Sequence, residues 1–386
     1  MVAITDWPFV PIIFRNFPVS HVLGLQAVAS NWRLRIDLYF QRDFFAFDAC
    51  GEVAASGRSE RTSPDSSFFH SLLRLLTSRC TKLRNLTIRE YLVPSMLNEL
   101  QQCILTDLLV LDLTFEPEEQ ASFLLPERLL TTPSANLLAL ALDFDKAPTS
   151  IEIVFETITT HCRSLQSLYV QLFPQDSAIR TDTYETAAWG FICNVLRMPS
   201  LRSLDLSMPF TFHPDLEFVP AAKLERLHLD DFSPRLLHFP LIPALSYFPD
   251  LKHLMIKSVW HERLLDSITR QCTRLTALYF SSYPGLHSTR LQIIALEKIA
   301  ERDENEVIKW LPELESVDVG HAQRSFDEQL LIQIRQLRPT LKLSFNSISF
   351  ALGEPVTSTG ANVEDEFADN DFVRDEIDDL LWEDYD

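Results

Sequence analysis

Five histidines lie within 49 residues of this sequence and are the side chains best suited to chemistry. They are His213, His228, His238, His253 and His261. Imidazole binds zinc and acts as a general base, but protein zinc ligands usually follow characteristic spacings that these histidines lack. The sequence also contains no P-loop, no G-x-S-x-G and no H-E-x-x-H motif. It therefore predicts no metal, no cofactor and no catalytic residue, and we expect a protein that is not an enzyme.

Two of these histidines, His228 and His253, lie in a motif that repeats along the chain. The motif is Leu-x-x-Leu-x-hydrophobic. Its nine copies begin at Leu83, Leu108, Leu137, Leu165, Leu201, Leu224, Leu251, Leu275 and Leu314. Most intervals are close to the period of about 20–29 residues that is typical of leucine-rich repeats, and the two longest indicate insertions.

Each copy predicts a short strand with one buried face, because apolar residues alternate at its fourth and sixth positions. Apolar segments of helical spacing precede several copies. These are 69–76, 151–162, 186–198 and 264–272, and a further helix is expected at 291–299. One strand–helix unit cannot bury its own apolar side, so neighbouring units must stack. The predicted fold is α/β, a leucine-rich-repeat solenoid of horseshoe form with a parallel inner sheet and outer helices.

Cysteines occupy one position of this repeat. Cys80, Cys162 and Cys272 each stand three residues before the first leucine of a copy, and no C-x-x-C pair occurs. A shared position before the strand predicts a shared buried role, with the thiols reduced.

The residues between the leucines should project from the inner face of the sheet. Those we expect to contact a protein substrate are Tyr169, Asp205, His228, Asp230, His253, Lys257 and Tyr279. Tyrosine is favoured at interface anchors, and a long sheet face suits a protein or peptide better than a small molecule. Charged residues at such positions can equally be simply solvated.

Composition narrows the possible partners. The chain has 386 residues and a formal net charge of −20, which argues against general binding to a nucleic-acid backbone. The N-terminus lacks the pattern of a signal peptide, and no apolar run approaches 18 residues. We expect a monomeric protein of the cytoplasm or nucleus that binds no membrane.

The first 50 residues differ from the repeats. Ile13, Phe14, Phe17, Leu23, Leu25, Val28 and Trp32 have the apolar spacing of two helices separated at Pro18. This segment resembles a degenerate F-box, the helical motif that docks on the Skp adaptor of cullin–RING ubiquitin ligases. It departs from the family at its start, where Trp7-Pro8 stands about two positions late. The other interpretation is a helical cap on the first repeat.

The sequence as a whole predicts four regions. They are an F-box-like motif or cap at 1–50, a linker at 51–67, the solenoid at 68–350 and an acidic tail at 351–386. A degenerate first repeat with Leu38 and Phe40 inward is also expected. The seven residues from Ile13 to Trp32 named above would contact the adaptor, and the solenoid would present a protein substrate to the cullin ligase.

The tail is expected to be disordered. Residues 361–386 contain 12 acidic residues against Arg374, together with seven large apolar residues. It could be merely solubilising, bind a basic partner, or fold back over the protein's own sheet. The alternative function is therefore an intracellular scaffold whose tail binds basic proteins such as histones. A regulator of a small GTPase is a third possibility, with no residue that supports it.

Overall fold

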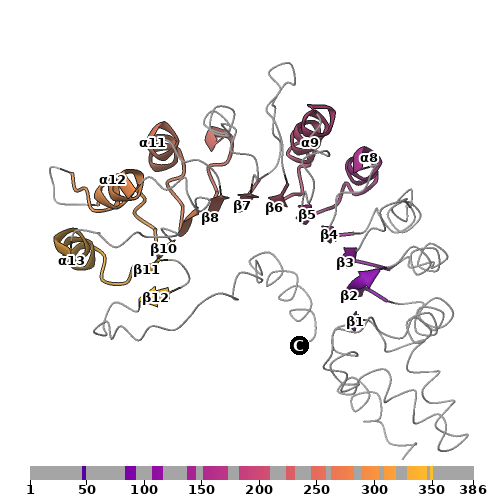
Figure 1. Ribbon diagram of the computed structural model, residues 1–386, viewed down its shortest axis with the longest axis horizontal. Coiled ribbons are helices and arrows are strands. Elements are labelled where there is room, and N and C mark those ends of the chain that lie inside the picture. The colour runs from indigo at the N-terminus through magenta and orange to yellow at the C-terminus, as the bar shows by residue number, and fades with distance from the viewer. Residues whose placement is uncertain are drawn as a thin grey trace, which may run out of the picture. The chain divides into compact units, whose positions relative to one another are not determined.

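The protein is α/β, with parallel strands and helices between them (Figure 1). The computed structural model describes residues 46–48, 83–92, 107–115, 137–144, 151–172, 182–208, 223–230, 245–257, 262–281, 289–303, 308–318, 328–345 and 348–350. The described elements fall into two compact units that divide after residue 175. The predicted repeat region, 68–350, extends over both units.

The first unit contains five strands that pair in sequence order, all parallel. They are β1 (Ala46–Asp48), β2 (Asn85–Leu92), β3 (Val110–Phe115), β4 (Ala139–Phe144) and β5 (Ser167–Leu172). Helix α8 (Ile151–His161) connects β4 to β5. The strands predicted after Leu83, Leu108, Leu137 and Leu165 are confirmed. The inward positions predicted at Leu38 and Phe40 lie outside the described residues.

The leucines of the motif form continuous layers across these strands. Leu111, Leu140 and Leu168 are paired in register and almost fully buried. At the ends of two strands the Phe115 and Phe144 rings stack with their centroids 4.8 Å apart. Burying each such side chain stabilises the fold by about 1.5–3 kcal/mol before the entropy of ordering is subtracted. The repeated spacing therefore produces the repeated packing.

The second unit continues the pattern with more helices. Its elements are α9 (Asp182–Val195), β6 (Ser203–Ser207), β7 (Arg226–Asp230), η3 (Leu245–Tyr247), β8 (His253–Lys257), α11 (Glu262–Gln271), β9 (Ala277–Ser281), α12 (Thr289–Ile299), β10 (Ser316–Asp318), α13 (Glu328–Leu337), β11 (Lys342–Phe345) and β12 (Ile348–Phe350). Strands β6 to β11 pair in parallel, and β12 pairs antiparallel with β11. The helices predicted before Leu165, Leu201 and Leu275, and the helix at 291–299, are confirmed.

A buried residue precedes six of the described strands, β5, β6, β8, β9, β10 and β11, at one fixed position. It stands three residues before the first apolar residue of the strand segment, and its carbonyl accepts a hydrogen bond from the N–H of that apolar residue. Its occupants are Cys162, Met198, Phe248, Cys272, Leu311 and Arg338, all at most 6% exposed. Burial raises the pKa of the Cys162 and Cys272 thiols to about 12. The predicted buried role of these two cysteines is confirmed, while Cys80 lies outside the described residues.

Arg338 is the exception among these apolar occupants. Its guanidinium donates hydrogen bonds to three backbone carbonyls: Nε to Ile299 at 3.1 Å, Nη1 to Leu311 at 2.8 Å and Nη2 to Trp310 at 2.5 Å. Leu311 has a φ of 48°, a left-handed conformation that is strained for leucine. Arg338 therefore links the end of α12 to the strained turn before β10.

Candidate functional site

The candidate site is the face of the second unit's sheet that points away from the buried leucines. Because side chains alternate along a strand, Ser203, Asp205 and Ser207 lie opposite Leu204 and Leu206. The strand register aligns two rows of such side chains across β6 to β10. One row is Ser203, Arg226, His253, Ala277 and Ser316; the other is Asp205, His228, Met255, Tyr279 and Asp318.

Four of the seven predicted contact residues are not exposed on this face. Tyr169 in the first unit and Asp205, His228 and Asp230 in the second are at most 4% exposed. The strands that carry these side chains are buried on both faces, so the four residues are covered in the chain by itself, and their contact with a partner stays a prediction.

Two pairs of these buried polar side chains lie within contact distance of each other. The Nδ1 atom of His228 lies 2.7 Å from Oδ2 of Asp205 on the neighbouring strand, which is the distance of an ion pair or a charge-assisted hydrogen bond. The Tyr169 hydroxyl donates to Oε1 of Gln171, two residues along the same strand. These contacts make Tyr169, Asp205 and His228 part of the folded interior.

The accessible part of the face lies further along the second unit. We call it the β7–β10 patch: Arg226, His253, Met255, Tyr279, Ser316 and Asp318, all partly exposed. Two of its members, His253 and Tyr279, were predicted contact residues. Lys257 ends β8 in register with Asp230 and Ser281, and its side chain lies outside what the structure describes.

Arg226 and Ser316 were missed by the sequence prediction. They occupy the third position of the Leu-x-x-Leu-x-hydrophobic motif, two residues before the fifth. Alternation along a strand puts the third and fifth positions on the same face. The same rule that selected Tyr279 therefore also selects Arg226 and Ser316.

Burial controls the protonation of this patch. Burial, helped by the positive charges of Arg226 and Lys252, lowers the pKa of His253 to about 4. Burial, with Asp318 nearby, raises the pKa of Tyr279, while a side-chain hydrogen bond with Ser316 opposes that rise. At neutral pH the patch therefore presents a neutral imidazole and a neutral phenol between Arg226 and Asp318.

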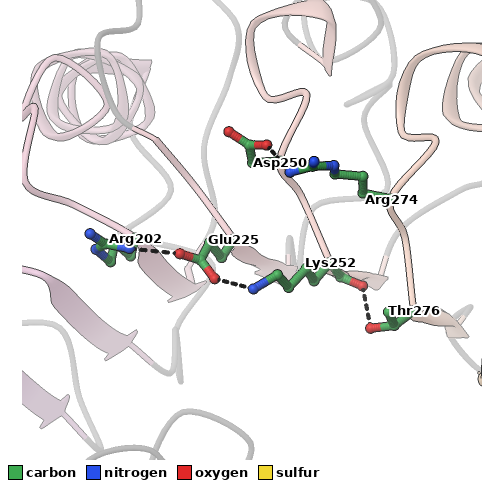
Figure 2. Close-up of polar contacts among 6 residues, drawn as sticks. All are labelled: Arg202, Glu225, Asp250, Lys252, Arg274 and Thr276. Carbon is green, nitrogen blue, oxygen red and sulfur yellow. Dashed lines mark hydrogen bonds and ion pairs between the residues drawn. The ribbon is translucent and has the colours of Figure 1, made fainter. Parts of the chain in front are cut away.

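A chain of ion pairs lies beside the patch, one residue before the strands. Glu225 lies between Arg202 and Lys252, with its carboxylate oxygens 2.8 Å and 2.6 Å from their nitrogens (Figure 2). The Lys252 carbonyl in turn accepts a hydrogen bond from the Thr276 hydroxyl. The hydrogen bond from Lys252 is the main cause that lowers the pKa of Glu225. These contacts connect the starts of β6 to β9 and so help to fix the register of the patch.

The predicted adaptor contacts cannot be placed on this structure. Ile13, Phe14, Phe17, Leu23, Leu25, Val28 and Trp32 all lie outside the described residues, as does the acidic tail. Within the described part of the chain, no group of three or more His, Cys, Asp or Glu side chains could hold a metal ion. None of the helices in that part is both long and apolar enough to cross a membrane.

Comparison with known proteins identifies no relative. No protein-family model matches the chain, and no curated protein matches it.

Proposed function

We propose that this protein is a leucine-rich-repeat receptor that serves as the substrate-recognition subunit of an SCF-type (Skp–cullin–F-box) ubiquitin ligase. The observation that carries the receptor part of the proposal is the β7–β10 patch, whose accessible side chains lie in two rows aligned across four parallel strands. In this role the protein binds its partner, and other subunits perform ubiquitin transfer.

The repeat architecture supports a solenoid. Each unit has parallel strands in sequence order, and the turn before a strand buries one residue at the same position. Solenoids stack such units and bind partners along their extended sheet face. The fold we propose is therefore a leucine-rich-repeat solenoid of horseshoe form.

The chemistry of the patch suits a protein substrate. Arg226, Met255 and Tyr279 belong to residue types that are enriched at protein interfaces. Four strands at about 4.8 Å spacing make a patch about 15 Å across, which matches a helix or an extended peptide segment of a partner. Asp318 and Arg226 add charges of both signs, so the complementary surface carries both signs as well.

The ligase assignment comes from the F-box-like segment. Its residues from Ile13 to Trp32 resemble the motif that docks on a Skp adaptor, and F-box proteins frequently carry leucine-rich repeats. The test is direct binding of a purified Skp adaptor to the full chain. Trp32→Ala should weaken the adaptor affinity at least tenfold, and Tyr279→Ala should leave it unchanged. No adaptor binding by the wild type, or equal binding by Trp32→Ala, would remove the ligase assignment.

The second candidate function is a scaffold that binds basic proteins through its tail. The observation that favours it is the net charge of −11 over residues 361–386. Such binding should fall steeply with salt, because exposed charges are screened within about 8 Å at physiological ionic strength. Binding to histones that is salt-sensitive and lost on removal of 361–386 would favour the scaffold over the ligase subunit.

A further inference from the structure

The inner face of β3 to β5 in the first unit is closed to solvent in the chain by itself. Val110 is 3% exposed, Ala139 and Ala141 are 0% exposed and Tyr169 is 1% exposed. Because side chains alternate along a strand, these side chains lie on the face of the sheet opposite the leucine layers. In the strand register Ala139 lies between Val110 and Ser167, and Ala141 lies between Asp112 and Tyr169. Side chains stand roughly perpendicular to a sheet, so these neighbours do not cover the short alanine methyl groups from above.

The burial is confined to part of the sheet. In the second unit, the corresponding positions of β8 to β10, such as Met255 and Tyr279, are partly exposed. A sheet face of this kind is therefore not buried by its own strands alone. On β3 to β5 another segment of the same chain must cover Ala139 and Ala141.

We propose that this segment is the C-terminal stretch 371–386, which docks on the inner face of β3 to β5 as an internal ligand. This proposal does not depend on the function proposed above. Its consequence is that the protein's own tail occupies the inner face of β3 to β5, so that an external partner can reach this face only by displacing the tail.

The sequence of the stretch fits an amphipathic helix. Val373, Ile377, Leu380 and Leu381 follow the i, i+4, i+7, i+8 spacing of one apolar helix face. Most of the acidic residues fall on the other side of that helix. Large aliphatic side chains also complement the small Ala139 and Ala141, which leave room above the sheet.

Charge favours the same orientation. Asp112 is 0% exposed on this sheet face, and a buried carboxylate needs a cation or several hydrogen-bond donors. Arg374 is the one basic residue of 361–386. It stands three residues before Ile377 and seven before Leu381, which places it on the apolar side of the helix. Docking by that side brings Arg374 to the sheet and turns most of the acids to solvent.

The chain is long enough for this arrangement. Strand β12 ends at Phe350, and 36 residues follow it. Extended, they would span about 120 Å. The 20 residues between Phe350 and the proposed helix can therefore act as a connector.

Photo-crosslinking in the full chain tests the proposal. With p-benzoylphenylalanine in place of Leu381, illumination of the monomer should give intramolecular adducts in the peptides that contain β3, β4 or β5. The same photo-residue in place of Asp379, on the opposite side of the helix, should give several-fold fewer adducts there. Adducts only in other segments, or equal yields from both positions, would overturn the proposal.

A footprinting measurement checks the same point without a crosslinker. Hydroxyl radicals should oxidise Tyr169 slowly in the wild type and several-fold faster in Ile377→Asp/Leu381→Asp. Asp378→Asn/Asp379→Asn is the matched control and should keep Tyr169 protected. Phe155, a buried residue of α8 on the other side of the sheet, should stay protected in all three proteins. An unchanged Tyr169 in the aspartate variant would assign the cover to another segment and so contradict the proposal.

Discussion

Replacing Arg338 with methionine should loosen the turn before β10. Methionine is chosen because Met198 occupies the same position before β6, so the turn itself tolerates the side chain. The change removes the three hydrogen bonds to the carbonyls of Ile299, Trp310 and Leu311. It also removes a buried guanidinium, whose pKa burial lowers to about 10, so the group is charged at neutral pH.

The magnitude follows from these opposing effects. The Leu311 carbonyl keeps the hydrogen bond from the Leu314 N–H, whereas the carbonyls of Ile299 and Trp310 lose a donor. At about 1–3 kcal/mol for each buried carbonyl left without a donor, these two cost about 2–6 kcal/mol. Removing the buried charge returns several kcal/mol of desolvation free energy. We therefore expect a net loss of about 2 kcal/mol, part of which comes from the φ of 48° at Leu311 that Arg338 helps to hold.

Hydrogen exchange measures this loss where it occurs. Amides of the segment 299–315 should exchange about 30-fold faster in Arg338→Met, because each 1.4 kcal/mol is a factor of ten. Arg335→Met is the matched control: Arg335 is exposed on α13, and its replacement should change exchange by less than about threefold. The exchange rates in Arg338→Lys should be close to those in Arg338→Met, because a single lysine ammonium cannot donate to all of the carbonyls that lie around the planar guanidinium. If Arg338→Met exchanges like Arg335→Met, the three hydrogen bonds contribute nothing net and the reasoning fails.

Three further predictions concern protonation and charge. Burial lowers the pKa of His253 from its ordinary 6.5 to about 4. As pH falls below 6.5, the imidazole is protonated in the unfolded chain before it is protonated in the folded one, so the folded state loses stability between pH 6.5 and about 4. The loss of stability is at most about 3 kcal/mol, and about 1–2 kcal/mol after discounting for the partial exposure of the side chain. Between pH 7.5 and pH 4.5, the free energy of unfolding in urea should therefore fall more for the wild type than for His253→Asn. Glu225→Gln should cost about 0.5–1 kcal/mol in urea unfolding, and 1 M salt should remove most of the difference; a larger, salt-independent cost would contradict the exposed ion-pair account. The Cys162 and Cys272 thiols, with pKa values of about 12, should resist iodoacetamide at pH 8 until urea unfolds the chain, and peptide mapping of early adducts at either residue would refute their burial.

The strands were predictable because their cause is local in the sequence. The spacing of Leu140 and Leu142 alone predicts a strand with a buried face. The preceding and following copies of the motif predict the two strands that pair with it. The position of Cys162 and Cys272 was predictable for the same reason. The burial of Arg338 was not predictable, because an arginine in the sequence does not indicate a guanidinium buried where the other repeats have an apolar side chain.

The candidate site was only partly predictable. Alternation correctly placed His253 and Tyr279 on the sheet face, and applied to the third motif position it would have found Arg226. Alternation gives the face of a side chain but not what lies over that face. For this reason the burial of Tyr169, Asp205 and His228 could not be read from the sequence.

The proposed function assigns two separate surfaces to this protein, the F-box-like segment for the adaptor and the β7–β10 patch for the substrate. Quantitative affinity purification with full-length baits tests this separation most directly. The baits are wild type, Trp32→Ala and Arg226→Ala/Tyr279→Ala. We predict that Trp32→Ala loses the Skp adaptor and cullin but keeps the remaining partner, and that the patch variant keeps the adaptor and loses that partner. Wild-type baits that recover no adaptor, or a patch variant that keeps every partner, would contradict the account.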